Sequence, residues 1–177
     1  MTVSVHRVEM TTVADAALHA VVEEEREAND VFHPDAVNHE SIAEPPDARG
    51  TGPAAFAATG RWLRTAFSEL AWTTTQHVVE GDLVVSYGLL SGRQTGDFVV
   101  WTPDVTVERA FAPTGKTFQV RQVHFQRIVN GFVVEHWAVR DDQSMGLQLG
   151  WVPPSPIYLW RCGRATRKAR RSALVPA

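Results

Sequence analysis

The spacing of apolar residues changes near residue 72, and this change restricts the fold more than any other feature of the sequence. Before it, residues 11–30 and 53–70 carry apolar side chains at helical spacing. After it, the pattern is typical of strands, which we predict at residues 72–80, 83–91, 118–129 and 132–140. Helices followed by antiparallel strands indicate an α+β domain. A curved sheet covered on its convex side leaves a concave side free, where a small molecule can bind.

Local signals set the expected limits of the earlier elements. Thr12 is a candidate cap for the first helix, and Pro34 ends the helical pattern. A short strand is predicted at residues 36–40 and a loop at 41–52, which is rich in Pro and Gly. Pro53 suits the first position of the second helix.

The later elements are predicted in the same way. Residues 92–117 read as a long irregular hairpin with short strands near 98–101 and 105–111. Asp141 is placed to cap a short helix that ends at Gly150. A further helix is expected from about Ile157, in a C-terminal helical tail.

Composition places the chain among single globular domains. It has 177 residues, 44% hydrophobic and 21% charged. No apolar run reaches the roughly 18 residues that span a bilayer, and the first residues lack an apolar export signal. The single cysteine, Cys162, excludes an internal disulfide and suits a reducing compartment. We therefore predict a cytoplasmic protein without a membrane partner.

Charge is distributed unevenly along the chain. Six basic residues and no acidic one lie within 161–171, whereas the remainder holds 20 acidic and 11 basic residues. Since this is not the basic face of a nucleic-acid-binding protein, we predict no such partner. The tail either contacts an anionic partner or is a solvated terminal helix, the simpler interpretation. We divide the chain into a domain at residues 1–155 and a basic tail at 156–177.

Polar residues concentrate in the last predicted hairpin and its exit, residues 120–150. Asn130-Gly131 allows a two-residue turn or a three-residue turn with a bulge at Gly131. The first places His124 opposite Trp137; the second places it opposite His136. Directly opposed residues project to the same face, so only the second turn gathers the polar side chains on one wall. We prefer it, because the first would bury half of them without partners.

These residues resemble the SnoaL-like polyketide cyclases, also called ester cyclases, of the NTF2-like superfamily. The resemblance covers roughly residues 10–155. It rests on Pro113-Thr114-Gly115, Gln122-x-His124-Phe125, Asn130-Gly131, Glu135-His136-Trp137, Arg140-Asp141-Asp142 with the ending Leu147 to Gly150, and residues 33–39 upstream. It implies a cone-shaped, strongly curved, mainly antiparallel sheet covered by helices. It also implies a homodimer or a higher homo-oligomer.

The resemblance implies chemistry as well. In cyclases of this family an intramolecular aldol reaction closes a polyketide ring without a metal or an organic cofactor, so we expect neither here. An aspartate directly after the His-Trp pair serves them as general acid and base. This chain has Ala138 at that position. Alanine cannot transfer a proton, so other residues have to do so.

Four residues are candidates for catalysis. His124 matches a pocket histidine of the family, and an imidazole can act as base or donor near neutral pH. His136 is the second candidate; both rings are equally compatible with a structural role. Asp141 and Asp142 are the available carboxylates, although capping or the first helical turn would also explain an aspartate there.

Five further residues are candidates for binding a substrate. Gln122 could hydrogen-bond a carbonyl, and Arg140 could bind a carboxylate or an enolate. His39 would line the pocket from the early strand, with Asn38 on the opposite side of that strand. Trp62 and Tyr87 would contribute aromatic lining.

The prediction is a cofactor-independent cyclase or isomerase that acts by proton transfer on a polyketide-like or other polycyclic small molecule. One alternative is a non-catalytic protein that binds a hydrophobic ligand, which Ala138 favours. Another is an epoxide hydrolase on a related fold. That class needs an Asp-Arg-Asp set, of which only Arg140 and Asp141 are visible. An enzyme requires polar groups that converge in the pocket, whereas a binding protein needs a mostly apolar cavity.

Overall fold

The computed structural model describes residues 2–23 and 28–174, with side chains from residue 7 onward. A mixed sheet has the strand order β1-β7-β6-β3-β2, with β1 parallel to β7 and the other pairs antiparallel. A second sheet consists of β4 and β5. The elements are α1 (Thr2–Val22), β1 (Phe32–Asn38), α2 (Gly52–Ala66), β2 (Phe67–Glu80), β3 (Leu83–Gln94), β4 (Phe98–Trp101), β5 (Val107–Phe111), β6 (Thr117–Val129), β7 (Phe132–Arg140), α3 (Asp142–Leu149) and α4 (Pro156–Ala173).

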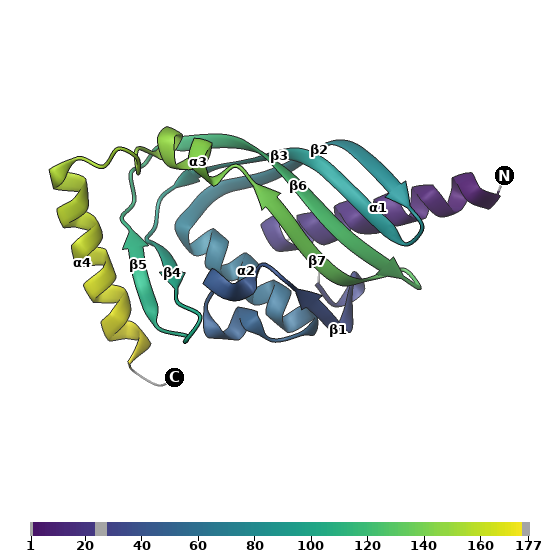
Figure 1. Cartoon of the computed structure of the whole chain (residues 1–177), viewed down its shortest axis with the longest axis horizontal. Coiled ribbons are helices and arrows are strands. Elements are labelled where there is room, and N and C mark those ends of the chain that lie inside the picture. The colour runs from purple at the N-terminus through teal and green to yellow at the C-terminus, as the bar shows by residue number, and fades with distance from the viewer. Residues whose placement is uncertain (1, 24–27, 175–177) are drawn as a thin grey trace.

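Helices α1 and α2 cover one face of the large sheet, which confirms the predicted α+β arrangement (Figure 1). The expectation that the pocket-forming face is free of helices is wrong, because both helices lie over that face and line the cavity. The alternation of side chains along the strands directs one set toward these helices. The core there includes Phe32 and Phe56, whose rings stack at 3.8 Å. Among the described residues, no helix is both long and apolar enough to cross a bilayer.

The helix limits differ from the sequence prediction. Helix α1 begins at Thr2, so Thr12 lies inside it, and its hydroxyl donates to the carbonyl of Val8 at 2.8 Å instead of capping. The helix ends at Val22, and residues 24–27 of the predicted helix lie outside the described residues. Helix α2 stops at Ala66 because the next residue already begins β2.

Two other segments are also more ordered than expected. Strand β1 starts at Phe32 and includes Pro34, at the edge of the sheet, where a missing amide proton is tolerated. The predicted loop at 41–52 contains two 3₁₀ turns, Ser41–Ala43 and Pro46–Arg49. These turns carry the chain from the end of β1 to α2.

The turn between β6 and β7 is the two-residue form, so the preferred three-residue turn was wrong. Val129 pairs with Phe132, and Asn130 and Gly131 have the positive φ angles, 51° and 82°, of a type I′ turn. A bulge at Val134 then shifts the register, so His124 lies opposite Ala138 and not opposite His136. The shift returns even-numbered residues of both strands to one face, and the predicted polar wall forms for this different reason.

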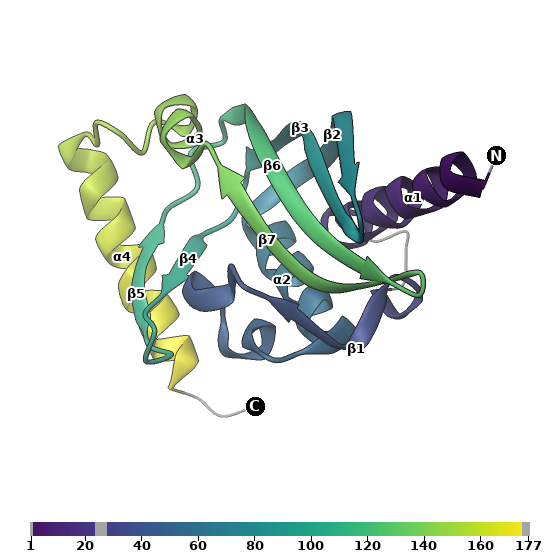
Figure 2. The same cartoon turned by 45° about the vertical axis from the view of Figure 1, so that its right-hand side comes forward.

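The C-terminal segment is a helix that packs against the small sheet (Figure 2). The hydroxyl of Tyr158 donates to the carbonyl of Ala112 at 3.0 Å, and the amide of Ala110 donates to the hydroxyl of Thr166 at 2.9 Å. The six basic side chains of residues 161–171 are all exposed. Helix α4 is therefore fixed along one side, and its basic face is solvated.

Candidate active site

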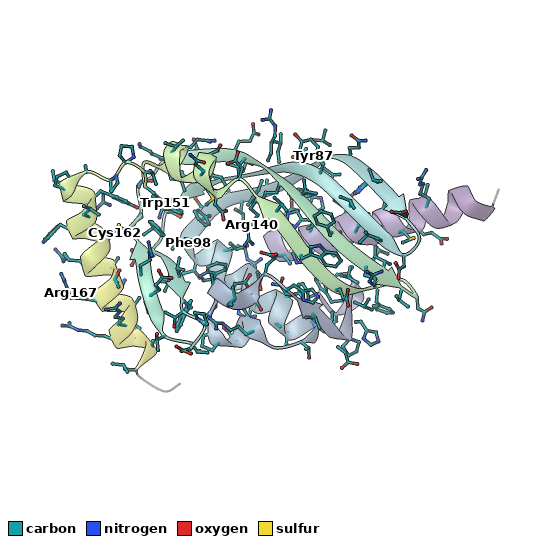
Figure 3. The ribbon with its side chains drawn as sticks, in the orientation of Figure 1. Tyr87, Phe98, Arg140, Trp151, Cys162 and Arg167 are labelled. Carbon is teal, nitrogen blue, oxygen red and sulfur yellow. The ribbon has the colours of Figure 1, made fainter. Side chains whose placement is uncertain are left out.

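A cavity of about 420 Å³ lies between the inner face of the large sheet and helices α1, α2 and α3. Much of its wall is apolar. At one end the rings of Phe98 and Phe111 stack on Trp151, with centroids 5.6 and 4.3 Å away. Figure 3 shows Phe98 and Trp151 near the small sheet. Such a wall suits a flat, apolar ligand. The polar residues that line the cavity are Asn38, Glu40, Glu44, Thr59, Gln122, His124, Gln126, His136, Arg140 and Asp142.

A chain of hydrogen bonds runs along the polar wall and fixes where the histidine protons lie. The amide N–H of Glu40 donates to Asn38 Oδ1 at 3.1 Å, so this oxygen is an acceptor. His136 Nδ1, 3.1 Å from the same oxygen, must then carry a proton and donate it. A neutral His136 thus presents the lone pair of Nε2. His124 Nδ1, 2.9 Å from that atom, must be the donor.

Both rings are favoured in their neutral form. Burial, followed by the charge of Arg140 and the neighbouring His39, lowers the pKa of His136 from 6.5 to about 3. Burial, the neighbouring His136 and the charge of Arg140 lower the pKa of His124 well below its ordinary value. At neutral pH His124 therefore keeps a lone pair on Nε2.

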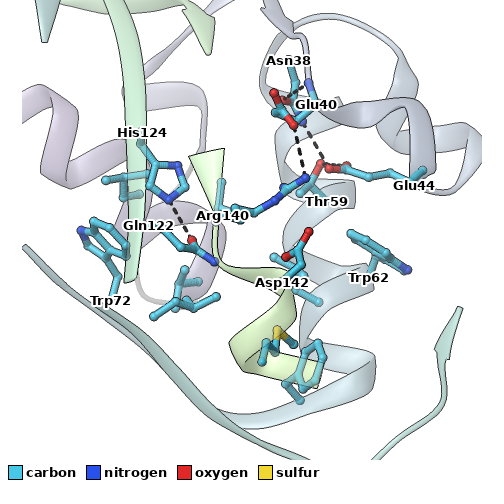
Figure 4. A pocket seen from close by; sticks show the side chains of 18 of the residues that line it. Asn38, Glu40, Glu44, Thr59, Trp62, Trp72, Gln122, His124, Arg140 and Asp142 are labelled. Carbon is cyan, nitrogen blue, oxygen red and sulfur yellow. Dashed lines mark hydrogen bonds and ion pairs between the residues drawn. The ribbon is translucent and has the colours of Figure 1, made fainter. Parts of the chain in front are cut away.

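The orientation of the Gln122 amide follows from this protonation state. Gln122 Oε1 lies 3.0 Å from His124 Nε2, which is a hydrogen bond only when Nε2 carries a proton (Figure 4). With His124 neutral, the amide must turn over so that its nitrogen donates to Nε2. One amide proton of Gln122, which is 4% exposed, is then left for a second acceptor in the cavity. The wall can thus donate to a substrate oxygen.

A buried carboxyl group supports the start of this chain. Glu44 is 2% exposed; the Thr59 hydroxyl donates to its Oε2 at 2.5 Å, and Asn38 Nδ2 donates to its Oε1 at 3.5 Å. Burial raises the pKa of Glu44, although the hydrogen bond from Thr59, the charge of Arg140 and the bond from Asn38 act in the opposite direction. Because Glu44 accepts from Nδ2 of Asn38, it helps to keep Oδ1 turned toward His136.

A second carboxylate, Glu40, crosses from the end of β1 to β7. Its Oε1 accepts from the amide of Ala138 at 3.4 Å, and its Oε2 accepts from Arg140 Nη2 at 3.2 Å. The side chains are 28% and 35% exposed. This ion pair thus lies where the cavity meets solvent.

The structure brings six of the nine predicted site residues to the cavity and leaves three outside it. The six are His124, His136, Gln122, Arg140, Asp142 and Trp62. Asp141 is exposed and caps α3, as predicted, by accepting from the amide and the hydroxyl of Ser144. His39 is exposed beside Trp137, and Tyr87 lies on the outer face of β3.

Five polar cavity residues were not chosen from the sequence: Asn38, Glu40, Glu44, Thr59 and Gln126. We expected His39 to face the cavity and Asn38 to face the opposite side of the strand. The structure has the reverse, since Asn38 pairs with His136 and faces inward. The sequence correctly indicated that neighbouring residues face opposite sides, but it did not indicate which of them faces the cavity. Glu44 and Thr59 come from a predicted loop and a helix without any motif. In the described part of the chain, no three His, Cys, Asp or Glu side chains are grouped so as to hold a metal ion.

Comparison with known proteins agrees with this geometry. The model of one protein family, described as SnoaL-like polyketide cyclase, matches residues 12–149. The chain belongs to this family. The nogalonic acid methyl ester cyclase of Streptomyces nogalater is 33% identical over 125 residues, which are 70% of this chain and 84% of the relative. The aklanonic acid methyl ester cyclase DnrD of Streptomyces peucetius is 32% identical over 126 residues, 71% and 79% of the two chains.

Solved structures confirm the NTF2-like fold of this SnoaL-like domain. TsrD from Streptomyces laurentii aligns with a TM-score of 0.65 and 24% identity, over 81% of this chain and 96% of its own. IdmH from Streptomyces antibioticus, described as a putative polyketide cyclase, aligns with a TM-score of 0.61 and 21% identity, over 80% and 98%.

Proposed function

We propose that the protein is a cofactor-independent cyclase that closes a ring in a polyketide-like substrate by an intramolecular aldol reaction. The observation that carries this proposal is the chain of hydrogen bonds from Asn38 through His136 and His124 to Gln122. It lies on one wall of an otherwise largely apolar cavity. Membership of the SnoaL-like polyketide cyclase family and the cyclases named among the relatives support a ring-closing reaction.

The reaction needs two kinds of chemical group in the cavity wall. A base must take a proton from the carbon next to a carbonyl, and a donor must stabilise the enolate oxygen that forms. Gln122 is suited to be the donor to the enolate oxygen, because the neutral His124 holds its amide nitrogen in a donating orientation. The enolate carbon then attacks a second carbonyl, and the resulting alkoxide receives a proton. No atom is gained or lost overall.

The charges of the cavity favour a neutral substrate. Among the lining residues Arg140 is the only lysine or arginine, and it is already paired with Glu40. Glu44 and Asp142 add further carboxyl groups. A substrate carboxylate would face these groups without a free cation. An ester avoids this repulsion, so we propose an ester substrate like those in the names of the relatives.

The two alternatives are less well supported. A protein that only binds an apolar ligand has no need for ten polar side chains in its cavity wall. An epoxide hydrolase with an Asp-Arg-Asp set would use Asp141, which is outside the cavity and engaged with Ser144.

The experiment is a turnover assay with aklanonic acid methyl ester and nogalonic acid methyl ester, followed by chromatography and mass spectrometry. We expect a cyclic product of unchanged mass from at least one ester, and slower turnover of the free acids. His124→Asn should lower kcat by a factor on the order of 100. His77→Asn is the matched control, since His77 lies on the same sheet but binds Asp15 and Ser86 outside the cavity. Binding of the esters without turnover would favour the ligand-binding alternative.

We further propose that the chain forms a homodimer through the outer face of its large sheet, and that it works in the cytoplasm. The outer face carries Val78 and Val139, which are 54% and 64% exposed, and the stacked rings of Phe125 and Trp137. Exposed apolar patches of this kind favour association. Light scattering coupled to size-exclusion chromatography should give twice the monomer mass for the wild type. Val139→Lys should reduce the measured mass to that of one monomer.

A further inference from the structure

We propose that Glu40 is a catalytic residue that transfers the proton in place of an aspartate at position 138. This inference rests on the proposed function, since it concerns the base that the aldol reaction needs. It moves the acid and base from strand β7 to the segment after β1.

The sheet register brings Glu40 to this position. Strand β1 runs parallel to β7, and Asn38 is paired with His136. Glu40 and Ala138 each lie two residues after this pair, and they lie beside each other. The contact is direct, because Glu40 Oε1 is 3.4 Å from the amide nitrogen of Ala138. A carboxylate is thus present beside residue 138, whose own side chain is only a methyl group.

The same residue is tied to the chain of hydrogen bonds by its backbone. The amide N–H of Glu40 is the donor that fixes Asn38 Oδ1 as an acceptor. Its side chain lines the cavity together with those of Gln122 and His124. The carboxylate and the donor wall therefore face the same space, as a base and an enolate-stabilising group must do.

The other carboxyl groups are less suited to this task. Asp141 is outside the cavity and engaged with Ser144. Glu44 is 2% exposed, and both of its oxygens already accept hydrogen bonds. Asp142 lines the cavity, but it is exposed and belongs to the first turn of α3, where the helix dipole is itself a reason for a carboxylate.

The chemistry balances with Glu40 alone. Arg140 holds Oε2 at 3.2 Å, which leaves Oε1 with one long hydrogen bond. Oε1 takes the proton from the α-carbon of the substrate, and the electron pair of that C–H bond forms the enolate. After the new C–C bond forms, the protonated Glu40 returns the proton to the alkoxide oxygen. The carboxylate is regenerated, and no further reagent is needed.

The test moves the carboxylate back to β7, with the methyl esters named above as substrates. Glu40→Gln keeps the shape of the side chain and should lower kcat by roughly 100-fold or more, with little change in KM. The double variant Glu40→Gln/Ala138→Asp should have a kcat at least ten-fold higher than that of Glu40→Gln alone. Asp47→Asn is the control, because Asp47 also pairs with an arginine, Arg61, at 3.2 Å but outside this cavity, and it should keep wild-type turnover.

The outcomes separate this inference from the proposed function. Wild-type turnover that Glu40→Gln retains would overturn the role of Glu40 and leave the cyclase proposal intact. A loss that Ala138→Asp does not restore would assign Glu40 to holding Arg140, and would also overturn the inference. No turnover of either ester by the folded wild-type protein would instead contradict the proposed function.

Discussion

The dependence of folding stability on pH should reveal the neutral ring of His136. Its pKa falls from 6.5 in the unfolded chain to about 3 in the folded protein. Between these values the unfolded state binds the proton and the folded state does not. The stabilisation is therefore complete above 6.5 and is lost as the pH falls toward 3. Near pH 4.5, two pKa units below the unfolded value, the loss amounts to about 3 kcal/mol.

This value can be measured as a difference between two proteins. Urea unfolding of the wild type and of His136→Gln is followed by tryptophan fluorescence at about pH 7.5 and at about pH 4.5. Glutamine retains one donor and one acceptor but does not titrate. The free energy of unfolding should fall by about 3 kcal/mol more in the wild type than in the variant over this interval. Acidic residues titrate equally in both proteins, so their contribution cancels.

His33→Gln provides the control, because the side chain of His33 is 44% exposed and lies outside the cavity. This variant should show the full wild-type loss of stability. The same loss of stability in His136→Gln as in the wild type would refute the neutral, desolvated state of His136, and with it the directions of the hydrogen bonds along the polar wall.

Three further substitutions test other parts of the structure. Asn38→Leu removes the acceptor for His136 Nδ1–H, so kcat should fall by roughly 10- to 100-fold, and ¹⁵N NMR should show a changed tautomer of His136; an unchanged tautomer would contradict the proposed chain. Gly88→Ala places a Cβ 2.5 Å from the Trp72 ring, so urea unfolding should show a loss of about 1–3 kcal/mol, and full stability would argue against this packing. Asp141→Ala removes the cap of α3 and should lower the melting temperature by about 2–4 °C. A large fall in kcat would instead return Asp141 to the catalytic residues.

The sequence predicted the types of most elements because their signals are local. Alternation, the Asn130-Gly131 turn and the cap at Asp141 all act within a few residues. The register of the last hairpin was less accessible. A type I′ turn alone would place His124 and His136 on opposite faces, and one extra residue, Val134, reverses this outcome. A bulge of this kind follows from packing on both sides of the strand, and valine carries no signal for it.

The candidate site was only half visible for a related reason. Gln122, His124 and His136 belong to one hairpin, so their spacing in the sequence reports their proximity. Asn38 and Glu40 join them through the parallel pairing of β1 with β7, across 98 residues for each contact. Parallel pairing between the two ends of a fold leaves no trace in local composition. The residues that complete the hydrogen-bond chain therefore required the structure.

The aromatic end of the cavity belongs to a different part of the chain from its polar wall. Phe98 and Phe111 lie on the small sheet, and Trp151 precedes α4, which is anchored to the end of β5 by side-chain hydrogen bonds. The groups that handle protons lie on β1, β6 and β7. Different segments of the chain thus determine the size of the cavity at its aromatic end and the chemistry at its polar wall. Replacing the small sheet and α4 as one unit offers a route to altered substrate range, in evolution or in design, while the reaction itself is preserved.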